Sequence, residues 1–173
     1  MRHQPSIWPG KLAVMNDTAN SRSLREGRRS IPGQIYSITT AVNHRQRYFA
    51  DSNRADLAKS VLEDSQTWPK SHPLLWVLMP DHLHLLLELQ TESLSIAVGR
   101  VKALISRRLK AIPTGGLWQA SFHDHALRRK ENFLTIGRYL LDNPVRAGLV
   151  SRAADWRWRG GSLVDAVGME WSK

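Results

Sequence analysis

The chain has 173 residues, of which 42% are hydrophobic, enough for one globular domain with a buried core. It contains no cysteine, which excludes disulfide bonds, thiol catalysis and thiolate metal sites. The formal net charge of +10 at pH 7 favours a polyanionic partner such as nucleic acid, although a basic composition is also compatible with a protein that binds none.

Residues 1–30 mix proline, glycine, serine and arginine without hydrophobic periodicity, which predicts a flexible basic N-terminal extension. This segment lacks the apolar stretch of a signal peptide, and the chain has no apolar run of about eighteen residues. We therefore expect a cytoplasmic protein with no membrane partner. We expect the folded domain over 31–150 and a C-terminal tail over 151–173.

The first half of the domain alternates between strand and helix patterns. A β-branched and aromatic run predicts a strand over 35–42, and apolar residues at helical spacing predict a helix over 51–67. Two apolar runs, 74–79 and 82–89, flank the tight-turn signal Pro80-Asp81. They predict two antiparallel strands joined by that turn.

The second half continues in the same manner. Its predicted elements are a helix over 94–112, a strand over 118–127, a helix over 130–141 and a break with a short turn over 143–149. Thr91 or Ser93 is available to cap the first of these helices. The resulting order predicts an α+β fold, an antiparallel sheet with helices packed mainly on one side.

The helix expected over 94–112 separates an apolar face from a basic face. No acidic residue occurs between Glu92 and Asp124. We expect the basic residues of this interval, and two more that lie near Tyr139, to contact phosphates. They are Arg100, Lys102, Arg107, Arg108 and Lys110, with Arg138 and Arg146.

Two histidines lie on the strand expected over 82–89. His82 and His84 are two residues apart, and a strand directs such residues to one face. Both imidazoles could then hold one metal ion, and without cysteine the available ligands suit Mg²⁺, Mn²⁺ or another divalent ion. The alternative is a pair of hydrogen-bonded polar side chains near a sheet edge.

A tyrosine and an asparagine lie near the end of the last predicted helix. Tyr139 and Asn143 are four residues apart, so they share a helix face and could enter one site together. The alternatives are a tyrosine that packs in the core and an Asn-Pro pair that forms a cap or turn.

These motifs occur together and in a specific order. The four segments are residues 77–86, 101–109, 117–125 and 139–150. Through them the sequence, from about Gly33 to Leu149, resembles the REP-associated tyrosine transposases, a branch of the HUH single-tyrosine transposases that process single-stranded DNA. The resemblance implies an HUH nuclease fold of ferredoxin-like or RRM-like type over 31–150, and a bacterial, nucleoid-associated enzyme.

The resemblance also implies roles for individual residues. His82 and His84 correspond to the metal ligands, Tyr139 to the nucleophile and Asn143 to the third protein ligand, where the wider superfamily has glutamine. The implied reaction nicks and rejoins DNA through a 5′-phosphotyrosine intermediate and a free 3′-hydroxyl, with Mg²⁺ or Mn²⁺ as cofactor. The implied partner is single-stranded DNA with hairpin-forming repeats, bound by a monomer or a homodimer.

Further residues have weaker signals. His123 and His125 share a face of the strand expected over 118–127 and are candidates to activate Tyr139, although structural roles are the stronger interpretation. Residues 156–161 interleave tryptophan and arginine, which is typical of single-strand contacts but also of a tail packed over the sheet. Core packing is likewise the stronger interpretation for Trp118 and Trp171.

Two other functional classes are compatible with parts of the sequence. A DNA-binding protein on the same fold could have lost the chemistry, but it would have no physical need to keep Tyr139 and both histidines. A histidine-triad nucleotide hydrolase would need a third histidine where Leu86 stands.

Overall fold

The computed structural model describes residues 30–110, 113–127 and 133–168, and all structural statements below concern these residues. The extension expected over 1–30 therefore lies outside the described residues except for Ser30, and so does Trp171. None of the described helices combines the length and the apolar character needed to cross a membrane.

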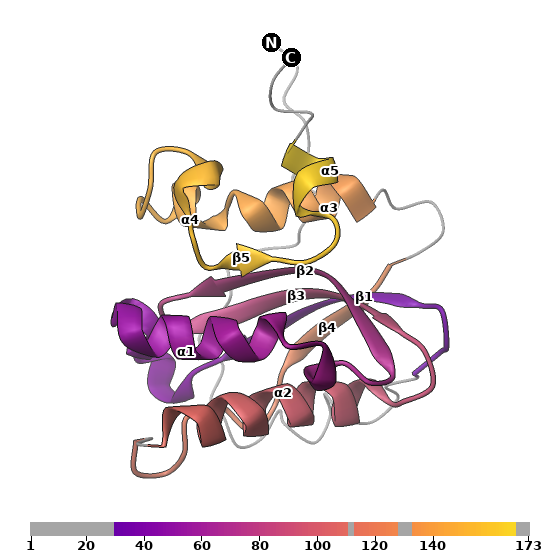
Figure 1. Ribbon diagram of the computed structural model, residues 1–173, viewed down its shortest axis with the longest axis horizontal. Helices are drawn as coiled ribbons and strands as arrows, with labels where there is room; N and C mark the ends of the chain where they lie inside the picture. The colour runs from indigo at the N-terminus through magenta and orange to yellow at the C-terminus, as the bar shows by residue number, and fades with distance from the viewer. Residues whose placement is uncertain (1–29, 111–112, 128–132, 169–173) are drawn as a thin grey trace.

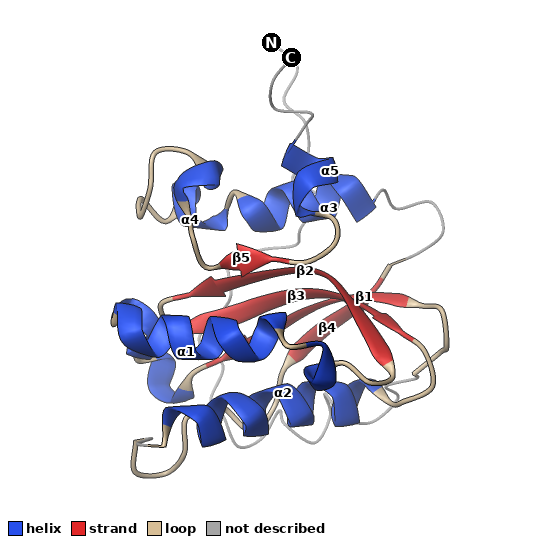
Figure 2. Ribbon diagram, in the orientation of Figure 1, coloured by secondary structure: helices blue, strands red, loops and turns tan. Residues whose placement is uncertain are grey.

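The centre of the molecule is a five-stranded antiparallel sheet with the order β4-β1-β3-β2-β5 (Figure 2). Its strands are β1 (Ile35–Ala41), β2 (Ser71–Met79), β3 (His82–Leu89), β4 (His123–Ala126) and β5 (Arg159–Gly160). The predicted hairpin is confirmed, since β2 and β3 pair from Met79↔His82 to Ser71↔Leu89 around the Pro80-Asp81 turn.

Helices cover both faces of the sheet. They are α1 (Ser52–Glu63), α2 (Leu94–Leu109), α3 (Phe133–Leu141), α4 (Asn143–Arg146) and α5 (Val164–Gly168). The two longest, α1 and α2, share one face, and α3 and α5 lie against the other (Figure 1). The expected α+β class is confirmed, but helices cover both faces of the sheet and not mainly one. Ser93 caps α2 by accepting a hydrogen bond from the Ile96 backbone.

Two hydrophobic cores follow from the alternation of side chains along the central strands. In β3, Leu83, Leu85 and Leu87 belong to the core under α1 and α2, whereas Leu86 belongs to the core under α3 and α5. Because alternate residues point the same way, His82 and His84 lie on the α3 side of the sheet. Burial on both faces also explains why β3 reads as an almost continuous apolar run.

The region expected as a strand over 118–127 is a strand only from His123 to Ala126. The residues before it cross the edge of the sheet as a loop that bridges Val42 at Trp118. Lys102 of α2 fixes this loop, because its Nζ donates to the carbonyls of Gln119 and Ser121 at 2.7 and 3.1 Å. A lysine therefore helps to organise this segment, together with the backbone hydrogen bonds from Gln119 to Ala41 and from Asn43 to Leu117.

The segment expected as a C-terminal tail supplies the edge strand β5, which pairs with β2 at Trp76↔Gly160. Trp156 is buried in the second core and donates to the Leu78 carbonyl at 3.0 Å. The Trp158 indole donates to Asp56 of α1 at 2.8 Å. Both indole N–H groups are thus used within the fold, which favours packing over base stacking for these two tryptophans.

Two glycines allow β5 to approach β2 closely. A Cβ at Gly160 would lie 2.4 Å from the Trp76 ring, and one at Gly161 would lie 2.6 Å from the Leu74 carbonyl oxygen. Gly161 also has a φ of +109°, which side chains with a Cβ rarely adopt. Glycine at 161 is therefore required both by conformation and by space.

We predict that Gly161→Ala lowers the free energy of unfolding by about 3 kcal/mol or more, because the new methyl group meets rigid backbone as well as an unfavourable φ. Gly33→Ala is the matched control: Gly33 has a φ of +75° but nothing within 4 Å of the added Cβ. It should cost only about 1 kcal/mol. Chemical denaturation of both variants measures the difference, and equal costs would contradict the close approach of β5.

Candidate active site

The side chains of His82 and His84 converge at the start of strand β3. Their Nε2 atoms lie 2.9 Å apart, with the two rings nearly perpendicular at 88°. Two nitrogens bound at right angles to a metal through bonds of about 2.1 Å would lie about 3.0 Å apart. The distance between the two Nε2 atoms therefore suits two adjacent ligands of one metal ion. The same distance also suits a hydrogen bond between the rings.

The other nitrogen of each ring has a partner of its own. The Nδ1 of His82 lies 2.6 Å from the Asp81 carboxylate, and the Nδ1 of His84 lies 2.9 Å from the Thr39 hydroxyl. A carboxylate there keeps the proton on Nδ1 of His82 and directs its Nε2 lone pair outward. A hydroxyl donates or accepts, so Thr39 is compatible with either tautomer of His84.

A strained turn at His44 and Arg45 holds the Asp81 side chain in place. His44 and Arg45 both have positive φ angles, 54° and 53°, which residues other than glycine adopt only at a cost. This conformation brings the Arg45 Nε to 3.1 Å from Asp81. The Asp81 carbonyl also accepts from the Val42 backbone at 2.9 Å, so the carboxylate that orients His82 is itself fixed from two sides.

Burial and neighbouring charges set the protonation of His84 and Asp81. Burial, then the charges of His82, Arg146 and Arg45, hold the pKa of His84 well below its usual range. Burial alone would raise the pKa of Asp81, but its hydrogen bond with His82 and the charges of His82 and Arg45 outweigh burial and lower it. At neutral pH the site thus holds a neutral His84, the form that binds metals, beside an ionised Asp81.

Tyr139 lies in the last turn of α3 and is 46% exposed. The neighbouring Leu140 and Leu141 pack in the same core as Val77 and Met79, so α3 lies over the sheet face that carries the histidines. The guanidinium of Arg146 stacks on the Tyr139 ring, 3.7 Å from its centroid. The nucleophile candidate and the histidine pair therefore lie on the same side of the sheet.

Asn143 begins α4, directly after α3. Its Oδ1 accepts from Arg146 Nη2 at 2.6 Å, and its Nδ2 donates to the Leu140 carbonyl at 3.0 Å. Within the part of the chain that the structure describes, no group of three or more histidine, aspartate or glutamate side chains is placed to hold a metal. The metal site thus depends on the histidine pair, and Asn143 as third ligand stays a prediction.

Arg100 and Lys102, which were predicted to bind phosphates, both make contacts within the fold. Arg100 pairs with Glu92, whose side chain is only 3% exposed, and its Nη1 donates to Glu92 Oε1 at 3.0 Å. Lys102 holds the loop before β4, as described above. Both charges are visible in the sequence, but the buried carboxylate and the carbonyls that they bind are not, because these partners meet them only in the folded chain.

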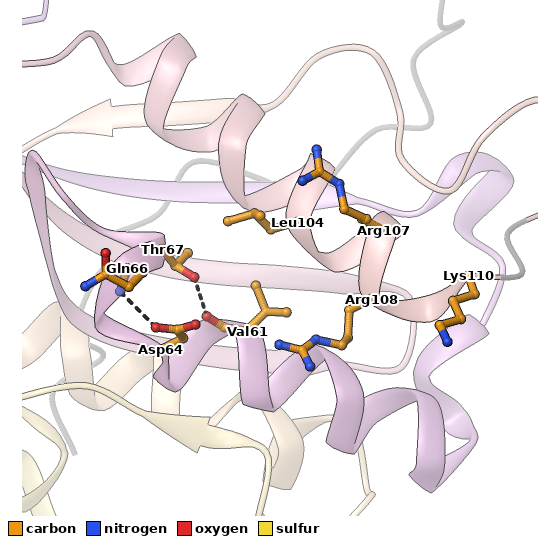
Figure 3. Close-up of a pocket in the computed structure, with 8 residues that line it drawn as sticks. All are labelled: Val61, Asp64, Gln66, Thr67, Leu104, Arg107, Arg108 and Lys110. Atoms are coloured by element: carbon orange, nitrogen blue, oxygen red, sulfur yellow. Dashed lines mark hydrogen bonds between the residues drawn. The ribbon is translucent and has the colours of Figure 1, made fainter.

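The other predicted basic residues, at the end of α2 and directly after it, line a pocket of 330 Å³ between α1 and α2 (Figure 3). The pocket residues are Val61, Asp64, Gln66, Thr67, Leu104, Arg107, Arg108 and Lys110. Since α1 and α2 cover the sheet face opposite the histidines, this basic surface and the histidine pair lie on opposite sides of the sheet. Arg138 and Arg146 are the predicted basic residues that α3 and α4 carry on the histidine side.

His123 and His125 of β4 occupy the same face as the histidine pair. Thr39 pairs with His84 on one side and with His123 on the other, so the three residues form one row across the sheet. Two strand spacings separate His123 from His84, about 10 Å between their backbones. A role for His123 or His125 in activating Tyr139 stays a prediction.

Comparisons with known proteins agree with this arrangement. Residues 30–143 match the family model described as IS200-like transposase. A candidate REP-associated tyrosine transposase of Haemophilus influenzae is 23% identical over 137 residues, which cover 72% of this chain and 77% of that protein. The REP-associated tyrosine transposase of Escherichia coli is 27% identical over 81 residues, 47% of this chain and 48% of that one.

A solved structure of a REP-associated tyrosine transposase bound to a REP hairpin superimposes with a TM-score of 0.63. The match has 22% sequence identity and covers 76% of this chain and 79% of the other. At this identity the likeness concerns the fold, and it confirms the architecture that the resemblance in sequence implied.

The Glu92–Arg100 pair makes a prediction for the stability of the fold. Burial raises the pKa of Glu92, but the hydrogen bond and charge of Arg100 outweigh burial and hold the pKa below its ordinary value of 4.5. The ionised pair therefore contributes stability above about pH 4.5 and loses it as the pH falls through the lowered pKa. We expect Glu92→Gln to cost about 1–3 kcal/mol at pH 7, and the cost to shrink in acid.

Denaturation at pH 7 and at pH 3 checks this expectation. Glu63→Gln is the matched control, because Glu63 makes only an exposed pair with Lys59 at 3.6 Å, and it should cost less than about 0.5 kcal/mol. A cost for Glu92→Gln that is the same at both pH values would contradict the role given to the ionised carboxylate.

Proposed function

The chain belongs to the IS200-like transposase family, and we propose that it nicks and rejoins single-stranded DNA through a covalent phosphotyrosine intermediate. The expectation of a transposase is confirmed by this membership. One observation carries the finer proposal: two histidines turn their Nε2 atoms toward each other on the sheet face over which α3 carries an exposed tyrosine. A binding module on this fold would need neither.

In the proposed nicking step, Tyr139 attacks the phosphorus of a DNA phosphodiester. A bond forms between its phenol oxygen and phosphorus, and the bond from phosphorus to the 3′ oxygen breaks. The phenol gives up one proton and the leaving 3′ oxygen takes one, so no water, oxidant or nucleotide is consumed. The free 3′-hydroxyl of the same or another strand can then reverse the step and join the DNA.

His82 and His84 fit a divalent metal, because their Nε2 atoms are correctly spaced and their Nδ1 atoms are anchored by Asp81 and Thr39. They would hold the ion together with Asn143. A bound Mg²⁺ or Mn²⁺ supplies a Lewis acid that polarises the phosphate and offsets charge on its oxygens. Around it, Asp81 and Thr39 fix the two imidazoles.

We propose single-stranded DNA with hairpin-forming repeats as the substrate. The net charge of +10 suits a polyanion, and the solved REP-associated tyrosine transposase of the same fold is bound to a REP hairpin. The two organisms named for the relatives are bacteria, so the proposed place of action is the bacterial cytoplasm and its nucleoid DNA.

Formation of a covalent adduct tests the proposal. The purified chain is incubated with Mn²⁺ and single-stranded hairpin DNA labelled at either end, then denatured. We expect the 3′-terminal label to stay with the protein and the 5′-terminal label to be released, because tyrosine joins the 5′ phosphate of the downstream piece. Tyr139→Phe should reduce the adduct on the order of a thousandfold or more, with DNA binding changed less than about twofold.

Tyr48→Phe is the matched control, since it makes the same chemical change in a tyrosine of the 3₁₀ turn before α1 and should keep the adduct. Wild-type binding to several hairpins without any adduct, in Mg²⁺ and in Mn²⁺, would replace the nuclease by a DNA-binding protein on the same fold. An adduct that persists in Tyr139→Phe would transfer the role to another residue.

The anchoring of the histidines predicts metal affinity independently of activity. Asp81→Asn keeps the size of the side chain but removes the charge that holds His82 and pairs with Arg45. We expect Mn²⁺ affinity, measured by calorimetry or electron paramagnetic resonance without DNA, to fall about 10–100-fold. His82→Ala removes a proposed ligand altogether, and its Mn²⁺ affinity is the reference with which the affinity of Asp81→Asn is compared. Unchanged affinity in both variants would refute the metal site.

A further inference from the structure

We propose that Arg146 is a positioning residue for the nucleophile, holding Tyr139 and Asn143 together as one unit beside the histidine pair. This inference rests on the proposed role of Tyr139. It gives Arg146 a task that differs from general attraction of DNA, because it acts through another side chain of the site.

One guanidinium makes all the contacts that join the two residues. It stacks on the Tyr139 ring at 3.7 Å from the centroid, its Nη1 donates to the Tyr139 carbonyl at 3.1 Å, and its Nη2 donates to Asn143 Oδ1 at 2.6 Å. Only a planar cation with several donors can stack on a ring and hold two acceptors at the same time. Lysine, as a flexible point charge, cannot replace this set.

The backbone presents Arg146 from a well-fixed element. In α4, Pro144 is buried at the start of the helix, and the Arg146 N–H donates to the Asp142 carbonyl at 2.9 Å. At the end of α4, the Gly148 N–H donates a hydrogen bond to the Val145 carbonyl at 2.9 Å. Because α4 follows α3 directly, the arginine reaches back over the tyrosine from a short distance.

Tyr139 needs such a partner because of its place in the fold. It is 46% exposed and lies two residues before the end of α3, where core packing does not fix its ring. An aromatic side chain with freedom of rotation would seldom point at the phosphate, and misplacement by about 1 Å costs on the order of a hundredfold in rate. The stacked guanidinium restricts the ring to one face of the helix.

Arg146 lies on the same side of the sheet as the histidine pair, because α4 directly follows α3, which packs over the face that carries the histidines. During nicking it exchanges no proton or electron; its charge stabilises the negative charge that develops on Tyr139 as the phenol loses its proton.

Single-turnover adduct formation at saturating DNA tests the proposal, with DNA affinity measured separately. We expect Arg146→Ala to slow the adduct step about 10–100-fold while the Kd for DNA rises less than about threefold. Arg146→Lys should recover little of the rate, since it restores charge but not the stack. The matched control is Arg152→Ala, which removes the same charge from an exposed residue paired with Asp155 and should keep the wild-type rate.

A spectroscopic measurement separates positioning from charge. In 3-fluorotyrosine protein without DNA, the ¹⁹F resonance of Tyr139, assigned by Tyr139→Phe, should shift and narrow in Arg146→Ala because the ring gains freedom. An unchanged resonance, a full rescue by lysine, or a rate loss matched by the loss of affinity would each overturn the proposal. If the wild-type chain forms no adduct, the proposed nuclease activity is refuted. The ¹⁹F spectrum would still test whether Arg146 restricts the Tyr139 ring.

Discussion

Strand β3 lies in the middle of the sheet, hydrogen-bonded to β1 on one side and to β2 on the other, and its register decides where each of its side chains points. Leu83, Leu85 and Leu87 enter the core under α1 and α2, so His82 and His84 must face α3. A slip by one residue would bury both imidazoles among the leucines of the larger core and move three leucines to the face under α3 and α5. The energy of the larger core therefore enforces the direction of the histidine pair.

The elements that could be predicted from the sequence are those in which the spacing of apolar residues shows which side chains are buried. The Pro80-Asp81 hairpin and the amphipathic α2 were predictable for this reason, with boundaries close to those observed. Strand β5 was not, because two residues carry no alternation; what fixes it is the fit of Gly160 and Gly161 against β2. Such complementarity exists only once the remote strand is in place.

The candidate site shows the same division. Residue spacing was sufficient to predict that His82 and His84 share a face and that Tyr139 and Asn143 lie close together, although Asn143 begins the separate helix α4. Their supports were not predictable, because Thr39 and Arg45 come from an adjacent strand and a strained turn. Nor does a count of charges show that the basic surface of α2 lies across the sheet from the histidines.

The two halves of the site differ in how firmly the fold holds them. The histidines lie on a central strand with anchored Nδ1 atoms, whereas Tyr139 lies on an exposed helix end and depends on Arg146 for its orientation. In the proposed reaction, joining is the reverse of nicking, so one geometry must serve both directions. Any loss of alignment at Tyr139 would then slow the cut and the repair alike. The junction of α3 and α4, where a single arginine binds the proposed nucleophile and its neighbour, is therefore the part of the fold on which the rates of both steps depend.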